Sequence, residues 1–140
     1  MAAYLADTSI WAWAKRSLVL AEKLRQRIAR GEVATCVPVA LEVLHSSSDG
    51  AEYEEDRRFL APLDWLPLTP EAADRALEVQ RTLAHTTHGA HRLPAVDYLV
   101  ASIAEAAGSG IVVWHHDRDL GRLCDFVGHP HEQERVRRRR

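Results

Sequence analysis

The pattern of apolar and polar residues predicts strands that alternate with helices from the start of the chain. Residues 3–6 form a short apolar run, and Asp7-Thr8-Ser9 behind it is a turn or helix-cap signature that leads into Ile10-Trp11-Ala12-Trp13. Between residues 18 and 30 apolar positions recur at helical spacing, and Gly31 stands where a helix would stop. This part of the chain therefore predicts a strand, a sharp turn, a helix and a further amphipathic helix.

The same alternation continues through the middle of the chain. Residues 33–37 are short, apolar and β-branched, and Pro38 is placed as the first residue of a helix over 39–44. Residues 50–60 are charged and helical in character, and residues 65–68 are a short candidate strand. The following helix begins at Pro70, and the residues expected on its apolar face are Ala73, Leu77, and Leu83 or Ala84.

The last third of the chain predicts an open loop, a helix and the clearest strand. Residues 85–93 suit a loop, and Pro94 opens a helix that closes at Gly108-Ser109-Gly110. Its inward residues are expected to be Leu99, Val100, Ile103 and Ala104. Residues 111–114 predict a buried strand, and hairpin dipeptides such as Asn-Gly do not separate the strands. Crossover connections then imply an α/β fold with a parallel sheet covered on both faces.

Size and charge limit the kinds of site that this chain can build. With 140 residues, of which 46% are hydrophobic, it has enough apolar material for one core. The formal net charge of −2 excludes binding of nucleic acid by bulk charge, so any such activity needs a local site. We expect one domain over residues 1–134 and a basic, disordered tail over residues 135–140.

Compartment and redox state are expected to be those of the cytoplasm. No apolar run approaches the roughly 20 residues that a membrane span needs, and no basic leader precedes an apolar stretch at the start. Cys36 and Cys124 lack the spacing of a zinc site or a redox pair. Both are interpreted as reduced, buried, small hydrophobic residues.

Acidic residues follow the predicted strands at the edge where parallel sheets bind ligands. They are Asp7, Glu42, Asp97 and Asp117, and Glu42 and Asp97 interrupt apolar stretches where a lone carboxylate is costly. Each alone has a structural interpretation as a helix cap, a first-turn acid or a turn residue. Together they place several negative charges at one end of the sheet without balancing basic residues nearby in the chain. Clustered carboxylates of this kind usually bind hard divalent cations, here Mg²⁺ or Mn²⁺, which neutralise their charge.

Four segments that carry these acids resemble the acidic motifs of VapC-type PIN domains, in order and at similar spacing. The segments are Leu5-Ala6-Asp7-Thr8-Ser9, Pro38-Val39-Ala40-Leu41-Glu42-Val43-Leu44, Leu93-Pro94-Ala95-Val96-Asp97-Tyr98-Leu99-Val100-Ala101 and His116-Asp117-Arg118-Asp119-Leu120. The resemblance implies a PIN-like three-layer α/β/α fold, in which helices flank a short parallel sheet. It also implies a metal-dependent endoribonuclease that cleaves tRNA, rRNA or mRNA as the toxin of a type II toxin–antitoxin module. A VapB-like antitoxin and a homodimer are the implied partners.

The resemblance assigns roles to individual residues. Asp7, Glu42, Asp97 and Asp117 match the catalytic acids that hold one or two Mg²⁺ or Mn²⁺ ions. Asp119 could also reach the metal, but Asp117 is favoured because it stands nearer the strand end. The ions would bind the scissile phosphate and lower the pKa of an attacking water, so no side-chain nucleophile is required. Ser9 either positions water or phosphate or serves only as a structural hydroxyl. Leu120 stands where the family commonly has an aromatic residue.

Several other polar and aromatic residues have competing interpretations. Lys15, Arg16 and Arg118 could contact RNA phosphates, although a solvated role is the simpler interpretation for each. Zinc binding by His85, His88 and His91 lacks a completing ligand, and His115 and His116 suit polar contacts at a strand end. The tryptophans suit a core or a subunit interface. The apolar surface expected for a dimer comprises Trp11, Trp13, Leu18 and Leu24.

Two other classes of function remain as alternatives. A non-catalytic PIN-like module that binds RNA or a protein would fit the low basic charge, but such a module usually lacks one of the acids. A phosphate-accepting receiver domain needs a lysine after a late strand, and the lysines of this chain are Lys15 and Lys23. The nuclease is therefore the favoured hypothesis.

Overall fold

The structure is a computed structural model that describes residues 1–86 and 88–136. Its centre is a five-stranded sheet with strand order β3-β2-β1-β4-β5, and all neighbouring strands run parallel. The strands are β1 (Tyr4–Ala6), β2 (Val33–Thr35), β3 (Asp64–Trp65), β4 (Val112–His115) and β5 (His131–Gln133). The predicted parallel α/β sheet is therefore confirmed. The tail predicted to be disordered covers residues 135–140, of which 137–140 lie outside the described residues.

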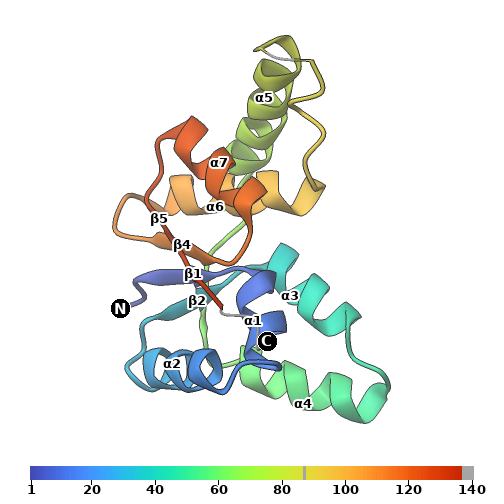
Figure 1. The fold of residues 1–140 in the computed structure, drawn as a ribbon, viewed down its shortest axis with the longest axis vertical. Coiled ribbons are helices and arrows are strands. Elements are labelled where there is room, and N and C mark those ends of the chain that lie inside the picture. The colour runs from blue at the N-terminus through green and yellow to red at the C-terminus, as the bar shows by residue number, and fades with distance from the viewer. Residues whose placement is uncertain (87, 137–140) are drawn as a thin grey trace.

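Helices connect the strands and cover the sheet. They are α1 (Thr8–Ala14), α2 (Leu18–Ala29), α3 (Val37–His45), α4 (Gly50–Leu60), α5 (Pro70–Thr86), α6 (Ala95–Ala107) and α7 (Arg118–Val127). Figure 1 shows α6 and α7 on one side of the sheet and α2 on the other, with α5 extending beyond α6. Within the described ranges, none of these helices has the length and apolar character needed to cross a membrane.

Alternation along the central strands creates two apolar cores. Leu5 and Val113 point into the larger core, to which α3, α5, α6 and α7 contribute. Ala6 and Trp114 point to the opposite face, where Ile10 of α1 and residues of α2 cover them. Period-two alternation on β1 and β4 thus produces the three layers that Figure 1 shows.

The predicted apolar face of α5 is right for Leu83, which packs against the larger core, and wrong for Leu77. The structure buries Ala72, Ala76 and Val79, whereas Leu77 remains 67% exposed. Ala72, Ala76 and Val79 also follow helical spacing, and their small side chains let α6 pack closely against α5. Local periodicity was satisfied by either stripe, and the choice depends on the neighbouring helix.

Several predicted boundaries also differ from the structure. The strand predicted at residues 65–68 is only Asp64–Trp65, and α5 continues to Thr86, inside the predicted loop. Helix α7 and strand β5 were not predicted. The end of α7 is marked by Gly128, which adopts a φ of 73° as a left-handed C-cap. Leu24, expected on a dimer surface, is buried in the core beneath α2.

Candidate active site

The acids at the ends of β1 and β4 lie next to each other because these strands are paired neighbours. Ala6 is in register with Trp114, and Asp7 directly follows β1 while Asp117 comes two residues after β4. Each aspartate caps the helix that follows, with its side chain accepting backbone N–H bonds at the helix N-terminus. The same backbone feature that starts α1 and α7 therefore places two carboxylates at one edge of the sheet.

Asp97 is a buried acid whose pKa is strongly raised. Its side chain is on the first turn of α6, the residue is 5% exposed, and Oδ2 has no hydrogen-bond partner among the described residues. Burial, followed by the charges of four neighbouring carboxylates, raises the pKa of Asp97 to about 8. In decreasing order of effect, these neighbours are Asp117, Asp7, Glu42 and Asp119. The four other predicted metal-site acids therefore all lie within electrostatic reach of Asp97.

Asp7 is held by Ser9. The Ser9 hydroxyl donates to Asp7 Oδ2 at 2.7 Å, and the Ser9 amide donates to the same oxygen at 3.1 Å. Burial raises the pKa of Asp7, and the two bonds from Ser9 offset only part of that effect. Ser9 Oγ also accepts the amide N–H of His116 at 2.9 Å, so it links the segments that carry Asp7 and Asp117.

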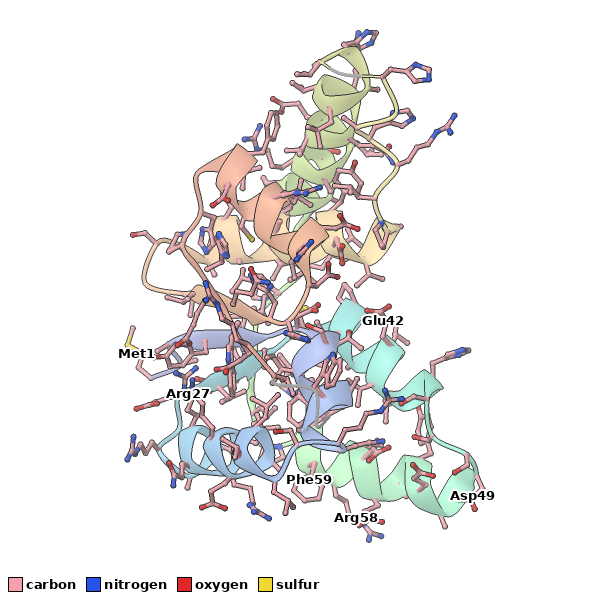
Figure 2. The ribbon with its side chains drawn as sticks, in the orientation of Figure 1. Met1, Arg27, Glu42, Asp49, Arg58 and Phe59 are labelled. Atoms are coloured by element: carbon pink, nitrogen blue, oxygen red, sulfur yellow. The ribbon has the colours of Figure 1, made fainter. Side chains whose placement is uncertain are left out.

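Glu42 enters the site from α3. Figure 2 shows it on the part of α3 that is turned toward α6, and its Oε1 accepts a 2.7 Å hydrogen bond from the Thr8 hydroxyl. Thr8 was not predicted as a site residue. The sequence indicated only a helix cap at Asp7-Thr8-Ser9. The bond between Thr8 and Glu42 could not be predicted, because the two residues are 34 positions apart.

Asp117 and Asp119 share one turn. Asp117 Oδ1 accepts the amide N–H of Asp119 at 2.9 Å and that of Leu120 at 3.4 Å. The Asp119 side chain is half-buried, and its charge contributes to the raised pKa of Asp97 less than that of Asp117 does. The geometry brings both aspartates to the site, with Asp117 exerting the stronger field on Asp97.

The donor set suits a hard divalent cation. In the described part of the chain none of these five carboxylates forms a salt bridge, and Asp97 buries a carboxylate oxygen that nothing satisfies. Across residues 1–86 and 88–136, however, no three His, Cys, Asp or Glu side chains are already gathered into a metal cluster. Mutual repulsion of unneutralised carboxylates opposes such gathering. An all-oxygen site of this kind fits Mg²⁺ or Mn²⁺ better than zinc.

The basic residues proposed for phosphate contact are not gathered at one place. Lys15 and Arg16 line an open groove with Lys23 and Arg135, and Trp13 forms part of its wall. The Trp13 ring contacts the edge of His116 at 4.8 Å between centroids, which places one wall of the groove beside the acidic site. Arg118 is exposed at the first position of α7 and does not line this groove.

The histidines at the end of β4 make the polar contacts expected there. His116 Nδ1 donates to the backbone oxygen of Glu134 at 2.7 Å. His115 is fully buried, and burial lowers its pKa to about 4. Its hydrogen-bond partners could not be predicted from the sequence. The two cysteines are buried as expected. No zinc cluster involving the described histidines is found.

Comparison with known families gives a consistent match. The family model described as the PIN domain matches residues 4–125. Ribonuclease VapC18 of Mycobacterium tuberculosis is 33% identical over 130 residues, which cover 92% of this chain and 93% of the relative. Ribonuclease VapC2 of the same species is 38% identical over 112 residues, covering 76% of this chain and 75% of the relative.

Solved structures share the fold at lower sequence identity. The DNA-bound VapBC structure from Salmonella typhimurium has a TM-score of 0.72 and 17% identity, with 95% of this chain and 98% of that chain covered. VapBC2 from Rickettsia felis, bound to a DNA fragment from its promoter, has a TM-score of 0.70 and 18% identity, covering 94% of this chain and 98% of that chain. At these identities the structures establish the architecture.

Proposed function

The chain belongs to the PIN-domain family and within it to the VapC group, and we propose on this basis that it is a metal-dependent endoribonuclease. We propose further that it is the toxin of a type II toxin–antitoxin module. The observation that carries the proposal is Asp97, a buried carboxylate near the charges of four other acids, with one oxygen that has no partner among the described residues. Such a site is unfavourable without a cation and favourable with one.

Asp7, Glu42, Asp97 and Asp117 would hold one or two Mg²⁺ or Mn²⁺ ions, with Asp119 as an additional ligand. When bound, the cation supplies Lewis-acid activation of water and stabilises negative charge on the phosphate oxygens. Asp97 must release its proton before it can act as a ligand, because its pKa of about 8 keeps it largely protonated at neutral pH.

The hydroxyl residues of α1 keep two ligands in place. Ser9 orients Asp7 through its hydroxyl and amide, and Thr8 orients Glu42 through its hydroxyl. Such bonds reduce the number of conformations a carboxylate can adopt and so lower the entropic cost of binding a cation. These bonds support a positioning role for Ser9 in addition to its place at the helix start.

The substrate in this proposal is cellular RNA, of the tRNA, rRNA or mRNA class. The groove is lined by Lys15, Arg16, Lys23 and Arg135 together with Glu134, which pairs with Lys23, so its lining is net basic. Arg118 adds a positive charge next to Asp117. Local basic charge of this kind compensates for the slightly negative net charge of the chain. RNA of these classes places the proposed activity in the cytoplasm.

The proposed partners are a VapB-like antitoxin and a second copy of the chain. An arginine of the antitoxin could pair with the uncompensated carboxylates and exclude the cation. For the homodimer, Leu18 and Val19 at the start of α2 offer apolar side chains that are 81% and 82% exposed. Light scattering at micromolar concentration that shows a monomer would contradict the dimer.

The test of the nuclease is cleavage of a structured RNA by purified protein with Mg²⁺ or Mn²⁺. Cleavage should stop on addition of a chelator and should be lost in Asp97→Asn. Asp74→Asn is the matched control, because Asp74 is an exposed acid on α5, a helix that carries none of the five site acids. Cleavage that survives chelation, or an equal effect of both substitutions, would contradict the proposal and favour the non-catalytic module.

A further inference from the structure

Beneath the turn that carries Asp117 lies a hydrogen-bonded chain of two histidines. His115, the last residue of β4, is fully buried, and its Nε2 lies 2.9 Å from Nδ1 of His131, the first residue of β5. The second nitrogen of His131 lies 2.7 Å from Oδ1 of Asp125 on α7. At the other end of the chain, the amide N–H of Asp117 donates to His115 Nδ1 at 3.1 Å.

The backbone amide of Asp117 fixes the role of every nitrogen in this chain. An amide N–H can only donate, so His115 Nδ1 must accept and the proton of the neutral imidazole sits on Nε2. That proton is donated to His131 Nδ1, which leaves His131 Nε2–H to donate to Asp125. Donation therefore runs in a single direction from the Asp117 amide through His115 and His131 to Asp125, and every imidazole nitrogen has a partner.

Gly121 on α7 provides the space that this pair occupies. A Cβ at this position would lie 3.0 Å from His115 Cε1 and 3.4 Å from His131 Cε1. The closer contact is with the ring of His115, which is fully buried and closely packed, so this ring cannot move freely. Helix α7 thus lies directly over the two rings, and the residues that start it are tied to β4 and β5.

We propose that His115 and His131 are positioning residues for Asp117, holding its turn in the orientation a metal ligand needs. His115 acts through the Asp117 amide, and His131 acts by holding the His115 ring in the accepting orientation. Ser9 fixes the same turn from the other side by accepting the amide of His116. This inference rests on the proposed function, since it assumes that the Asp117 carboxylate binds a cation.

If the two histidines only filled space, a side chain of similar volume could replace His115. If they position Asp117, the replacement must also provide an atom that accepts the Asp117 amide N–H. The two requirements are separated by His115→Asn and His115→Leu. An asparagine Oδ1 occupies the position of a histidine Nδ1 relative to the backbone and can accept the Asp117 amide, but leucine of similar size cannot. Asp125→Asn is the control, because the Asp125 side chain is 74% exposed and its bond to His131 is weakened by solvent.

The readouts are Mn²⁺ affinity by electron paramagnetic resonance without RNA, and kcat and KM for RNA cleavage at fixed Mn²⁺. His115→Leu should weaken Mn²⁺ binding about 10- to 100-fold, the usual effect of losing a residue that orients a ligand. Its kcat should fall while KM for RNA is unchanged, and His115→Asn should recover most of both losses. Equal Mn²⁺ affinity in the leucine and asparagine variants would overturn the inference.

If the His115 variants fail to fold, the same comparison at His131 decides. His131 is a half-buried residue, so its replacement disturbs the core less. His131→Asn keeps an acceptor for His115 Nε2–H, and His131→Leu leaves that buried donor without a partner. Weaker Mn²⁺ binding in the leucine variant than in the asparagine variant supports the inference, and equal binding overturns it.

The wild-type protein separates this inference from the proposed function. If it cleaves RNA with Mn²⁺ but the leucine and asparagine variants bind Mn²⁺ equally, only the positioning role is wrong. If it binds Mn²⁺ in a manner that depends on His115 but does not cleave RNA, the positioning role stands and the proposed nuclease is wrong.

Discussion

The Ser9 hydroxyl donates a 2.7 Å hydrogen bond to Oδ2 of Asp7, one of two carboxylates that cap helices at the edge of the sheet. The same oxygen of Ser9 accepts the His116 amide, one residue before Asp117. A single hydroxyl therefore links the ends of β1 and β4. Its loss should disturb both acids at once.

Ser9→Ala is expected to lower kcat/KM for RNA cleavage about 10-fold or more, within the range found when a residue that orients a metal ligand is lost. Ser9→Thr keeps a hydroxyl and should retain more activity. The measurement is steady-state cleavage at saturating Mg²⁺. Equal rates for Ser9→Ala and the wild type would show that the hydroxyl only starts the helix.

Asp117→Asn should abolish cleavage and weaken Mn²⁺ binding, whereas Asp119→Asn should reduce both much less. The reason is that Asp117 exerts the largest charge effect on Asp97 and Asp119 the smallest of the four neighbours. An asparagine oxygen can still cap α7, so the fold should persist, which circular dichroism can check. Loss of activity only in Asp119→Asn would reverse the assignment of the metal ligand.

Asp97→Asn should raise the melting temperature of the metal-free protein, and more so at high pH. The folded-state pKa of Asp97, about 8, lies above the ordinary 3.8, so the folded state holds the proton more tightly. The free energy of unfolding therefore declines as pH rises between these two values and levels off above them. Each kcal/mol corresponds to about 4 °C for a chain of this size.

The measurement for Asp97 is thermal melting with a chelator at pH 5, 7 and 9, with Asp74→Asn as the matched surface control. The advantage of Asp97→Asn over the wild type should grow with pH, while the control should show no such trend. A lower melting temperature for Asp97→Asn at pH 9 would mean that the buried carboxylate stabilises the fold.

Mn²⁺ affinity should rise with pH and level off near pH 8. Below this value a cation that binds Asp97 must displace its proton, which weakens apparent binding by about tenfold for each pH unit. Calorimetry in buffers of different ionisation enthalpy should show proton release at pH 7 and little at pH 9. Affinity that is independent of pH would exclude Asp97 as a ligand.

Arg27→Lys should lower the free energy of unfolding by about 1–2 kcal/mol and leave Mn²⁺ affinity unchanged. The Arg27 guanidinium lies 3.8 Å from the Tyr4 ring centroid and 4.4 Å from that of Trp114, and it bonds both carboxylate oxygens of Glu132. Figure 2 shows Arg27 between α2 and the sheet. Lysine keeps the charge but cannot form the planar double contact.

Urea denaturation measures this effect, and Arg25→Lys is the control. Arg25 pairs with Glu22 on the exposed side of α2, where an ion pair contributes only about 0.5 kcal/mol. Similar losses for both variants would show that the stacked position of Arg27 adds no stability.

The sequence determined the architecture and the edge at which the acids meet. Apolar strands that alternate with amphipathic helices require crossover connections, so the sheet had to be parallel. Carboxyl ends of parallel strands meet at one edge, which brings together Asp7 and Asp117 although 110 positions separate them along the chain. Their helix caps are local signals that the residue order alone contains.

The side chains that surround those acids are set by contacts between elements that lie far apart along the chain. Thr8 meets Glu42, His115 meets His131 and Arg27 meets Glu132 through contacts that span 34, 16 and 105 positions. Either apolar stripe of α5 satisfied helical periodicity, and packing against α6 selected the one with small residues. Periodicity reports the environment of a residue relative to its own helix or strand, whereas partner choice depends on distances between elements that no local pattern encodes.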